Sequence, residues 1–137
     1  GQHTCAIRPC AVYGIDPELK RSHGYGIIEE LRKSKSYKRP GGGKFVHVED
    51  VARATVAAIG NAEAAGKPYN LVDCYLRWAD WAVMAADLMG VKCDIDLSSP
   101  SQSRNTFTKD AARSLGVNLD RGPEGVREHL KALLGRM

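Results

Sequence analysis

The chain lacks an uninterrupted apolar run of about 18 residues, the length that a helix needs to cross a bilayer. Its first residues, 1–7, also lack the charged-then-apolar layout of a secretory signal. These absences predict a protein that neither spans a membrane nor is exported, and that resides in the cytoplasm.

Cysteine is sparse and does not form a recognisable metal or redox motif. The four cysteines include no pair separated by two residues, and no histidine lies close enough in sequence to complete a compact metal site. We therefore predict no metal and free or buried thiols in a reducing compartment. The thiols are Cys5, Cys10, Cys74 and Cys93.

Positive charge is concentrated in one segment. Residues 20–44 contain eight Lys or Arg and two Glu, which is 8 − 2 = +6, whereas the whole chain carries +4, so the rest sums to −2. A compact basic segment favours a small anionic ligand over a nucleic acid, which needs charge spread over a whole face. Tyr37 is the only aromatic residue within the basic run 32–39, and single-stranded nucleic acids are bound by several aromatic side chains that stack on the bases. A nucleic-acid partner is therefore the least favoured. A merely solvated loop is the other interpretation.

The pattern of apolar residues predicts one α/β domain over residues 1–137. At 137 residues and 43% hydrophobic content, the chain is large enough to bury one core. Short strands alternating with helices favour an α/β class, with mostly parallel strands. Strands are expected within residues 4–13, 45–48, 69–72 and 91–97. Helices are expected over residues 26–34, 49–60, 78–90, 109–115 and 123–135, with a loop at 98–106.

Four segments, in order, resemble those of the extended short-chain dehydrogenase/reductases, the NAD-dependent epimerase/dehydratase family. The first matches the family's Arg-Pro-x-x-Val-Tyr-Gly segment through Arg8, Pro9, Val12, Tyr13 and Gly14. The second resembles Phe-Val-His-Val-x-Asp-Val-Ala through Phe45, Val46, His47, Val48, Asp50, Val51 and Ala52. The third is the strand Tyr69, Asn70 and Leu71. The fourth resembles a helix late in the family's sequence that contains a Lys and ends in Leu-Gly. It comprises Thr108, Lys109, Ala112, Leu115 and Gly116.

The resemblance implies the C-terminal, substrate-side part of such an enzyme, without its complete Rossmann half. Residues 1–14 would be a strand and loop of the missing dinucleotide-binding sheet, and residues 15–137 the substrate-side region. Full-length members use NAD or NADP. The implied function is the substrate-binding portion of an epimerase, dehydratase or reductase that acts on a sugar nucleotide or another anionic small molecule.

The residues for hydride chemistry are not in this sequence. A dinucleotide site needs a glycine-rich turn before a helix, and neither Gly24 and Gly26 nor the glycines at 41–43 have the required spacing. The family also uses a Tyr followed four positions later by a Lys, and no Tyr here has that neighbour. We therefore assign no catalytic residue and expect the isolated chain to bind no cofactor and to be inactive.

The resemblance also suggests ligand positions. The loop after Arg-Pro borders the nicotinamide and the substrate in the family, so Pro9 and Cys10 are candidate cofactor contacts, and Ala11 and Tyr13 are candidate substrate contacts. Ala11 stands where many relatives have a substrate-binding Asn. Strand-end packing is the other interpretation of these residues.

Later positions divide into ligand and structural candidates. Family members that act on sugar nucleotides bind the diphosphate with an Arg at the position of Gly43. The adjacent Lys44 is the candidate that would supply this positive charge here. His47 is interpreted as a packed, hydrogen-bonded histidine and Asp50 as a helix-start residue, so both are expected to be structural. The pair Trp78 and Trp81 is expected to anchor the core.

Two further expectations concern partners. The strand 5–10 would lack neighbours on at least one side without the other half, so we expect a homodimer formed through that edge or by exchange of the strand. The alternative function is a free-standing binding or assembly module descended from the same domain.

Overall fold

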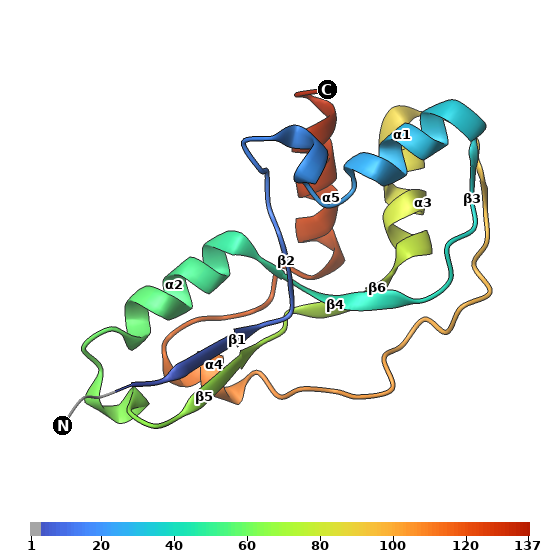
Figure 1. Ribbon diagram of the computed structural model, residues 1–137. Coiled ribbons are helices and arrows are strands. Elements are labelled where there is room, and N and C mark those ends of the chain that lie inside the picture. Colours follow the sequence, from blue (N-terminus) through green and yellow to red (C-terminus); the bar gives the residue numbers. More distant parts are fainter. Residues whose placement is uncertain (1–3) are drawn as a thin grey trace.

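The computed structural model describes residues 4–137 and shows the expected mixed α/β fold, with mostly parallel strands (Figure 1). The strands are β1 (Ala6–Pro9), β2 (Ala11–Tyr13), β3 (Ser36–Tyr37), β4 (Gly42–His47), β5 (Pro68–Leu71), β6 (Cys74–Arg77) and β7 (Asp94–Ile95). The helices are α1 (Tyr25–Ser34), α2 (Val48–Ala58), α3 (Trp78–Met89), α4 (Asp110–Ser114) and α5 (Gly122–Leu134), with 3₁₀ turns at Leu19–Arg21 and Ala62–Ala64.

The strands form three small sheets. β1 pairs in parallel with β5, and β3 pairs in parallel with β7. In the third sheet β4 lies between β2, which is parallel to it, and β6, which is antiparallel. The single strand predicted within residues 4–13 is therefore two strands in two sheets, separated at Cys10, directly after a proline that cannot donate to a ladder.

The five predicted helices are confirmed. The longer ones combine an apolar stripe with a clear end. α1 buries Ile27, Ile28 and Leu31, and α3 stops at Gly90, whose φ of 66° suits glycine. The strands β3 and β6 were not predicted. They contain two and four residues, too few for alternation to show. No helix within residues 4–137 has the length and apolar character to cross a membrane.

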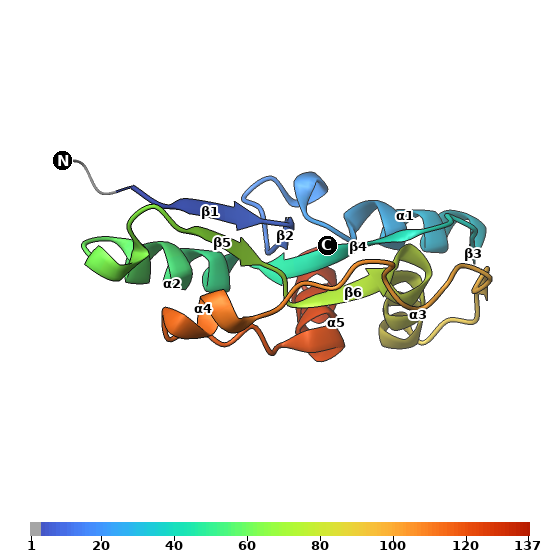
Figure 2. The ribbon, with the colours of Figure 1, turned by 90° about the horizontal axis from the view of Figure 1, so that it is seen from below.

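Two apolar cores lie on either side of β4. The first core is enclosed by α1, α3 and α5, and includes Phe45, Trp81 and Leu130. The second core lies beneath α2 and α4, and includes Val46 and Leu71. Figure 2 shows α2 and α4 at one end of the molecule and α1 and α3 at the other, with β4 running between them. Adjacent residues of one strand therefore enter different cores, because side chains alternate between the faces of a strand.

Buried charges join the start of α5 to the second core. Asp50 is only 1% exposed, and its carboxylate accepts a hydrogen bond of 2.9 Å from Nε of Arg121, 71 positions away. Asp73 is 5% exposed and accepts from the backbone N–H of Gly122 at 2.9 Å and from Nζ of Lys109 at 3.4 Å. Buried carboxylates are costly without such partners, so these contacts fix where α5 begins.

We expect the Arg121→Ala substitution to lower the free energy of unfolding by about 3 kcal/mol, because it leaves the Asp50 carboxylate buried without its main partner. Arg113→Ala is the matched control. It removes an exposed ion pair with Asp110 and should cost less than about 1 kcal/mol. Urea unfolding followed by tryptophan fluorescence measures both changes, and equal losses would show that the Asp50 contact has no special importance.

Candidate functional site

Two cavities meet at His23. The first has a volume of about 340 Å³ and lies where β2 ends, and its lining comprises Val12, Tyr13, Gly14, Ile15, Asp16, Pro17, Arg21, His23 and Val48. The second has a volume of about 590 Å³ and lies between the start of α1, β3 and α3. Its lining comprises His23, Gly24, Gly26, Ile27, Glu30, Tyr37, Arg39 and Trp78. The two cavities are therefore adjacent and share the lining residue His23.

His23 packs against aromatic residues of the first core. Its ring centroid lies 6.1 Å from that of Phe45 and 6.2 Å from that of Trp81. The backbone carbonyl of His23 lies 2.8 Å from Nε2 of His129 on α5. His23 is thus fixed to the first core by its ring and by its backbone carbonyl.

Two glycines line the second cavity, Gly24 and Gly26. Gly24 caps α1 with a φ of 94°, and a Cβ atom there would lie 2.6 Å from Cδ2 of Leu130. A larger residue would be strained by both the backbone conformation and the contact. Because Gly26 also has no side chain, the first turn of α1 presents bare backbone to the cavity.

Each cavity has an arginine on its lining. In the second cavity the guanidinium of Arg39 lies 4.3 Å from the ring centroid of Trp78. Arg21 lines the first cavity and pairs with Glu18 at 3.0 Å. A guanidinium recognises phosphate and carboxylate groups with two parallel hydrogen bonds, so the pair of cavities is chemically suited to an extended anionic ligand.

Tyr13 is the predicted site residue that lines a cavity, yet its side chain is fully buried. Its ring makes edge contacts with His47 at 5.0 Å and Trp81 at 6.0 Å. Its hydroxyl has no hydrogen-bond partner among the described residues and points at Gly125, where a Cβ would lie 2.7 Å from it. The ring packs as a core residue, and a substrate contact of Tyr13 stays a prediction.

Pro9, Cys10 and Ala11 lie at the junction of β1 and β2. Pro9 is exposed, whereas Cys10 and Ala11 are half-buried. Burial raises the pKa of Cys10 to about 11, so at neutral pH its sulfur is a thiol and a poor nucleophile. No observation tests the predicted cofactor contacts of Pro9 and Cys10 or the substrate contact of Ala11, and these stay predictions.

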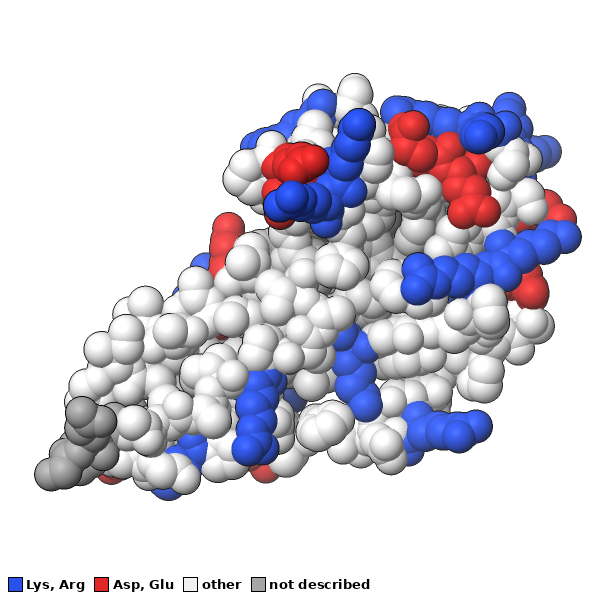
Figure 3. All heavy atoms as spheres, viewed as in Figure 1, with Lys and Arg blue, Asp and Glu red and all other residues white. Residues whose placement is uncertain are grey.

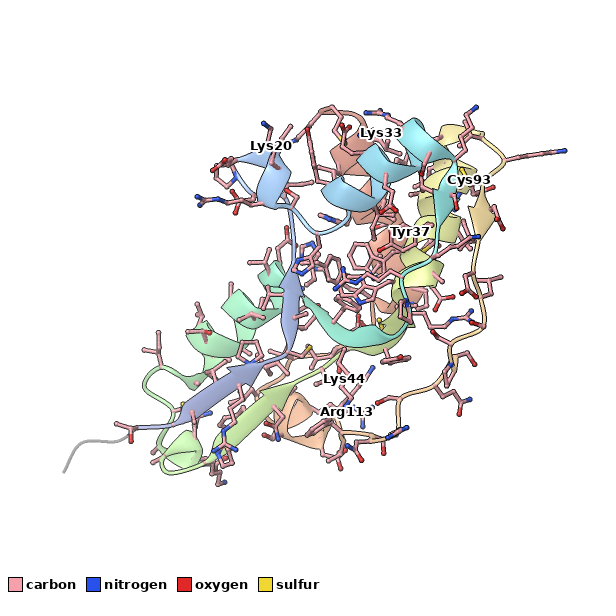
Figure 4. The ribbon with its side chains drawn as sticks, turned by 45° about the vertical axis from the view of Figure 1, so that its right-hand side comes forward. Lys20, Lys33, Tyr37, Lys44, Cys93 and Arg113 are labelled. Carbon is pink, nitrogen blue, oxygen red and sulfur yellow. The ribbon has the colours of Figure 1, made fainter. Side chains whose placement is uncertain are left out.

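Lys44 lies on the opposite face of β4 from Phe45. Its ammonium group sits 4.7 Å from the ring centroid of Phe107, and Figure 4 shows Lys44 and Tyr37 on opposite sides of the strand. Lys44 is close enough to Cys10 for its charge to oppose part of the rise in that thiol's pKa. The structure therefore brings Lys44 near Cys10 but not beside Arg39, and its proposed diphosphate contact stays a prediction.

His47 and Asp50 both contribute to the start of α2. Nδ1 of His47 accepts a hydrogen bond of 3.1 Å from the N–H of Glu49, which caps the helix. Asp50 binds Arg121 as described above. The predicted structural roles of His47 and Asp50 stay a prediction.

The sequence analysis did not single out His23, Arg39 and Trp78, which line the second cavity, as candidate site residues. Arg39 was counted in the basic segment and Trp78 among the core anchors, but nothing in the local pattern indicated that they would stack. Only the pairing of β3 with β7 and the packing of α1 on α3 bring them together. Within residues 4–137, no cluster of three or more His, Cys, Asp or Glu side chains could hold a metal ion.

No family model and no curated protein sequence matches the chain. Solved structures match its fold. An epimerase from Methanothermobacter thermautotrophicus has a TM-score of 0.70 at 15% identity, over 95% of this chain and 42% of that one. UDP-glucuronic acid 4-epimerase from Bacillus cereus, in complex with UDP-glucuronic acid and NAD, has a TM-score of 0.63 at 22% identity, over 94% and 45%. UDP-N-acetylglucosamine 4-epimerase from Methanobrevibacter ruminantium, in complex with UDP-N-acetylmuramic acid, has a TM-score of 0.63 at 17% identity, over 98% and 47%.

These matches establish the fold. The chain has the mixed α/β fold of the C-terminal part of these epimerase structures, in agreement with the predicted fold class. It spans less than half the length of each of those three proteins.

Stability should fall as the pH drops from 7 to 5. Burial lowers the pKa of His23, His47 and His129 below the usual value of 6.5. Above pH 6.5 these histidines are neutral in both states. As the pH falls through that value, the unfolded chain binds protons that the folded chain resists, so unfolding becomes easier. Urea midpoints measured between pH 8 and 5 test this, and His129→Gln should weaken the dependence. A midpoint independent of pH would contradict the expectation.

Proposed function

We propose that this chain is the substrate-binding portion of an NAD(P)-dependent epimerase-, dehydratase- or reductase-like enzyme that acts on a sugar nucleotide or another anionic small molecule. The observation that carries the proposal is the coverage of the fold matches, which extend over at least 94% of this chain but at most 47% of the three epimerases. The two cavities that share His23 support the proposal, because each has an arginine on its lining that could bind an anionic group.

A nucleotide sugar suits the shape and charge of this site. Such a molecule has a planar base, a diphosphate and a sugar in line, and two of the matching epimerases were solved with UDP-sugars. We assign the nucleotide end to the second cavity. There Arg39 is pre-positioned against Trp78, so little side-chain entropy is lost when it binds a phosphate or stacks on a base. The sugar would then reach past His23 into the first cavity.

The chemistry itself would come from another part of the protein. The sequence contains neither the Tyr and Lys pair for proton transfer nor a glycine-rich turn for the pyrophosphate of NAD. Pro9 and Cys10 would then face the cofactor held by that part. This chain binds and orients the substrate, and it does not perform the reaction alone.

The proposal predicts that the chain binds UDP-glucose but not NADH. The Arg39→Ala substitution should weaken UDP-glucose binding about tenfold, the effect of losing roughly 1.4 kcal/mol of interaction with a charged group. Arg32→Ala is the matched control, because Arg32 lies on the outer side of α1 and pairs with Glu29. Isothermal titration measures the sugar nucleotide, and fluorescence titration measures NADH. Saturable NADH binding, or equal effects of the two substitutions, would refute this assignment.

The free-standing assembly module remains the second candidate, and the open edge of β1 favours it. We propose that the isolated chain forms a homodimer through this edge, since unpaired strand edges recruit other strands. Light scattering across a dilution series should show dissociation. The Ile7→Pro substitution removes an N–H from that edge and should weaken the dimer, provided that circular dichroism shows a folded chain. A parent chain that is monomeric at every concentration would defeat the idea.

A further inference from the structure

One acidic side chain on the lining of the second cavity has no ionic partner. Glu30 lines that cavity and is exposed. Its carboxylate forms no ion pair with any residue of the described range 4–137. The preceding residue, Glu29, pairs with Arg32 at 3.4 Å. Because a carboxylate only accepts hydrogen bonds, the side chain of Glu30 is available to a ligand that donates them.

The position of Glu30 on α1 places its side chain over bare backbone. Gly26 lies four residues earlier and lines the same cavity, so the two residues share one face of the helix. Helical side chains lean toward the N-terminus of their helix, which carries the side chain of Glu30 toward the turn at Gly26. A Cβ atom added at Gly26 would meet no neighbouring heavy atom within 4 Å. The helix therefore leaves room beside the Glu30 carboxylate for part of a ligand.

The same cavity also has a positive group on its lining. Arg39 follows β3, and its guanidinium lies 4.3 Å from the ring centroid of Trp78 at the start of α3. Both charges act on the hydroxyl of Tyr37, whose pKa is raised by burial, lowered by Arg39 and raised further by Glu30. Figure 3 shows acidic and basic side chains near one another over α1 and β3, at the upper right of the molecule. A ligand in this cavity therefore meets charges of both signs.

We infer that Glu30 binds the ribose hydroxyls of a nucleotide and makes the second cavity selective for ribonucleotides over deoxyribonucleotides. The inference rests on the proposed function, which assigns the nucleotide end of the substrate to this cavity. The two hydroxyls of ribose are neighbouring donors, and one carboxylate accepts from both, as an acidic residue does for the ribose of a bound dinucleotide. Arg39 then binds a phosphate or stacks on the base, so each charge of the cavity meets a group of suitable chemistry.

The charge of Glu30 is the origin of this selectivity. A carboxylate in a cavity that takes a diphosphate repels the phosphates. Hydrogen bonds from the ribose hydroxyls offset this repulsion, because bonds to a charged acceptor are stronger than bonds between neutral groups. A deoxyribose lacks one of the two donors, so one of these bonds is lost while the repulsion remains. The deoxyribonucleotide therefore binds more weakly than the ribonucleotide.

The test compares UDP-glucose with dUDP-glucose, which lacks only the 2′-hydroxyl of the ribose. Isothermal titration of the chain should show at least about tenfold weaker binding of dUDP-glucose, the effect of one lost hydrogen bond to a charged group. In the Glu30→Ala variant UDP-glucose should bind more weakly, and the two dissociation constants should become nearly equal. Glu29→Ala is the matched control, because Glu29 is the adjacent exposed glutamate of α1 and should leave the ratio unchanged. Circular dichroism checks that both variants are folded.

The role of Glu30 and the proposed function fail in different ways. Equal affinity of the unchanged chain for the two molecules overturns the role of Glu30 and keeps the proposed function. A ratio that survives in Glu30→Ala also overturns it, because the selectivity then comes from another group. If both molecules bind more tightly to that variant at the same ratio, the carboxylate acts only by repulsion. Binding of neither molecule to the unchanged chain removes the proposed function, and the role of Glu30 with it.

Discussion

The alternation of side chains along β4 is the constraint on which the rest of this structure depends. Phe45 enters the core beneath α1, α3 and α5, and Val46 enters the core beneath α2 and α4. Because β4 also pairs with β2 on one side and β6 on the other, it fixes the position of one core relative to the other. The cavities at His23 exist because this relation leaves space where β2 ends and α1 begins. A shift of one residue in register would exchange the two faces and remove both cores.

The same constraint separates residues that the sequence places together. Lys44 is adjacent to Phe45 in the chain, yet it lies on the opposite face of the strand, against Phe107. Arg39, five residues earlier, is on the side of the first core and stacks on Trp78. Positive charge that is continuous in sequence is therefore divided in space, and only part of it is available to a ligand in the cavities.

The sequence predicted the long, periodic elements and the fold class, but not which residues would line the two cavities. Helices such as α3 carry both an apolar stripe and a terminal glycine, and these local signals survive in the structure. Strand β6 has only four residues and directly precedes a helix, so its pattern was too short to identify. The meeting of His23, Arg39 and Trp78 depends on how helices and strands pack, and no local pattern encodes that packing. The family resemblance located the loop beside the first cavity, through Tyr13, and missed the second cavity.

The contacts of α5 have a consequence for the order of folding. This helix contributes Val126, Leu130 and Leu133 to the first core, and the residue before it, Arg121, neutralises Asp50 beside the second. The first core therefore stays incomplete until α5 packs on it, and the Asp50 carboxylate lacks its main partner until Arg121 reaches it. Contacts so distant in sequence slow folding, because loops must close before the contacts stabilise anything.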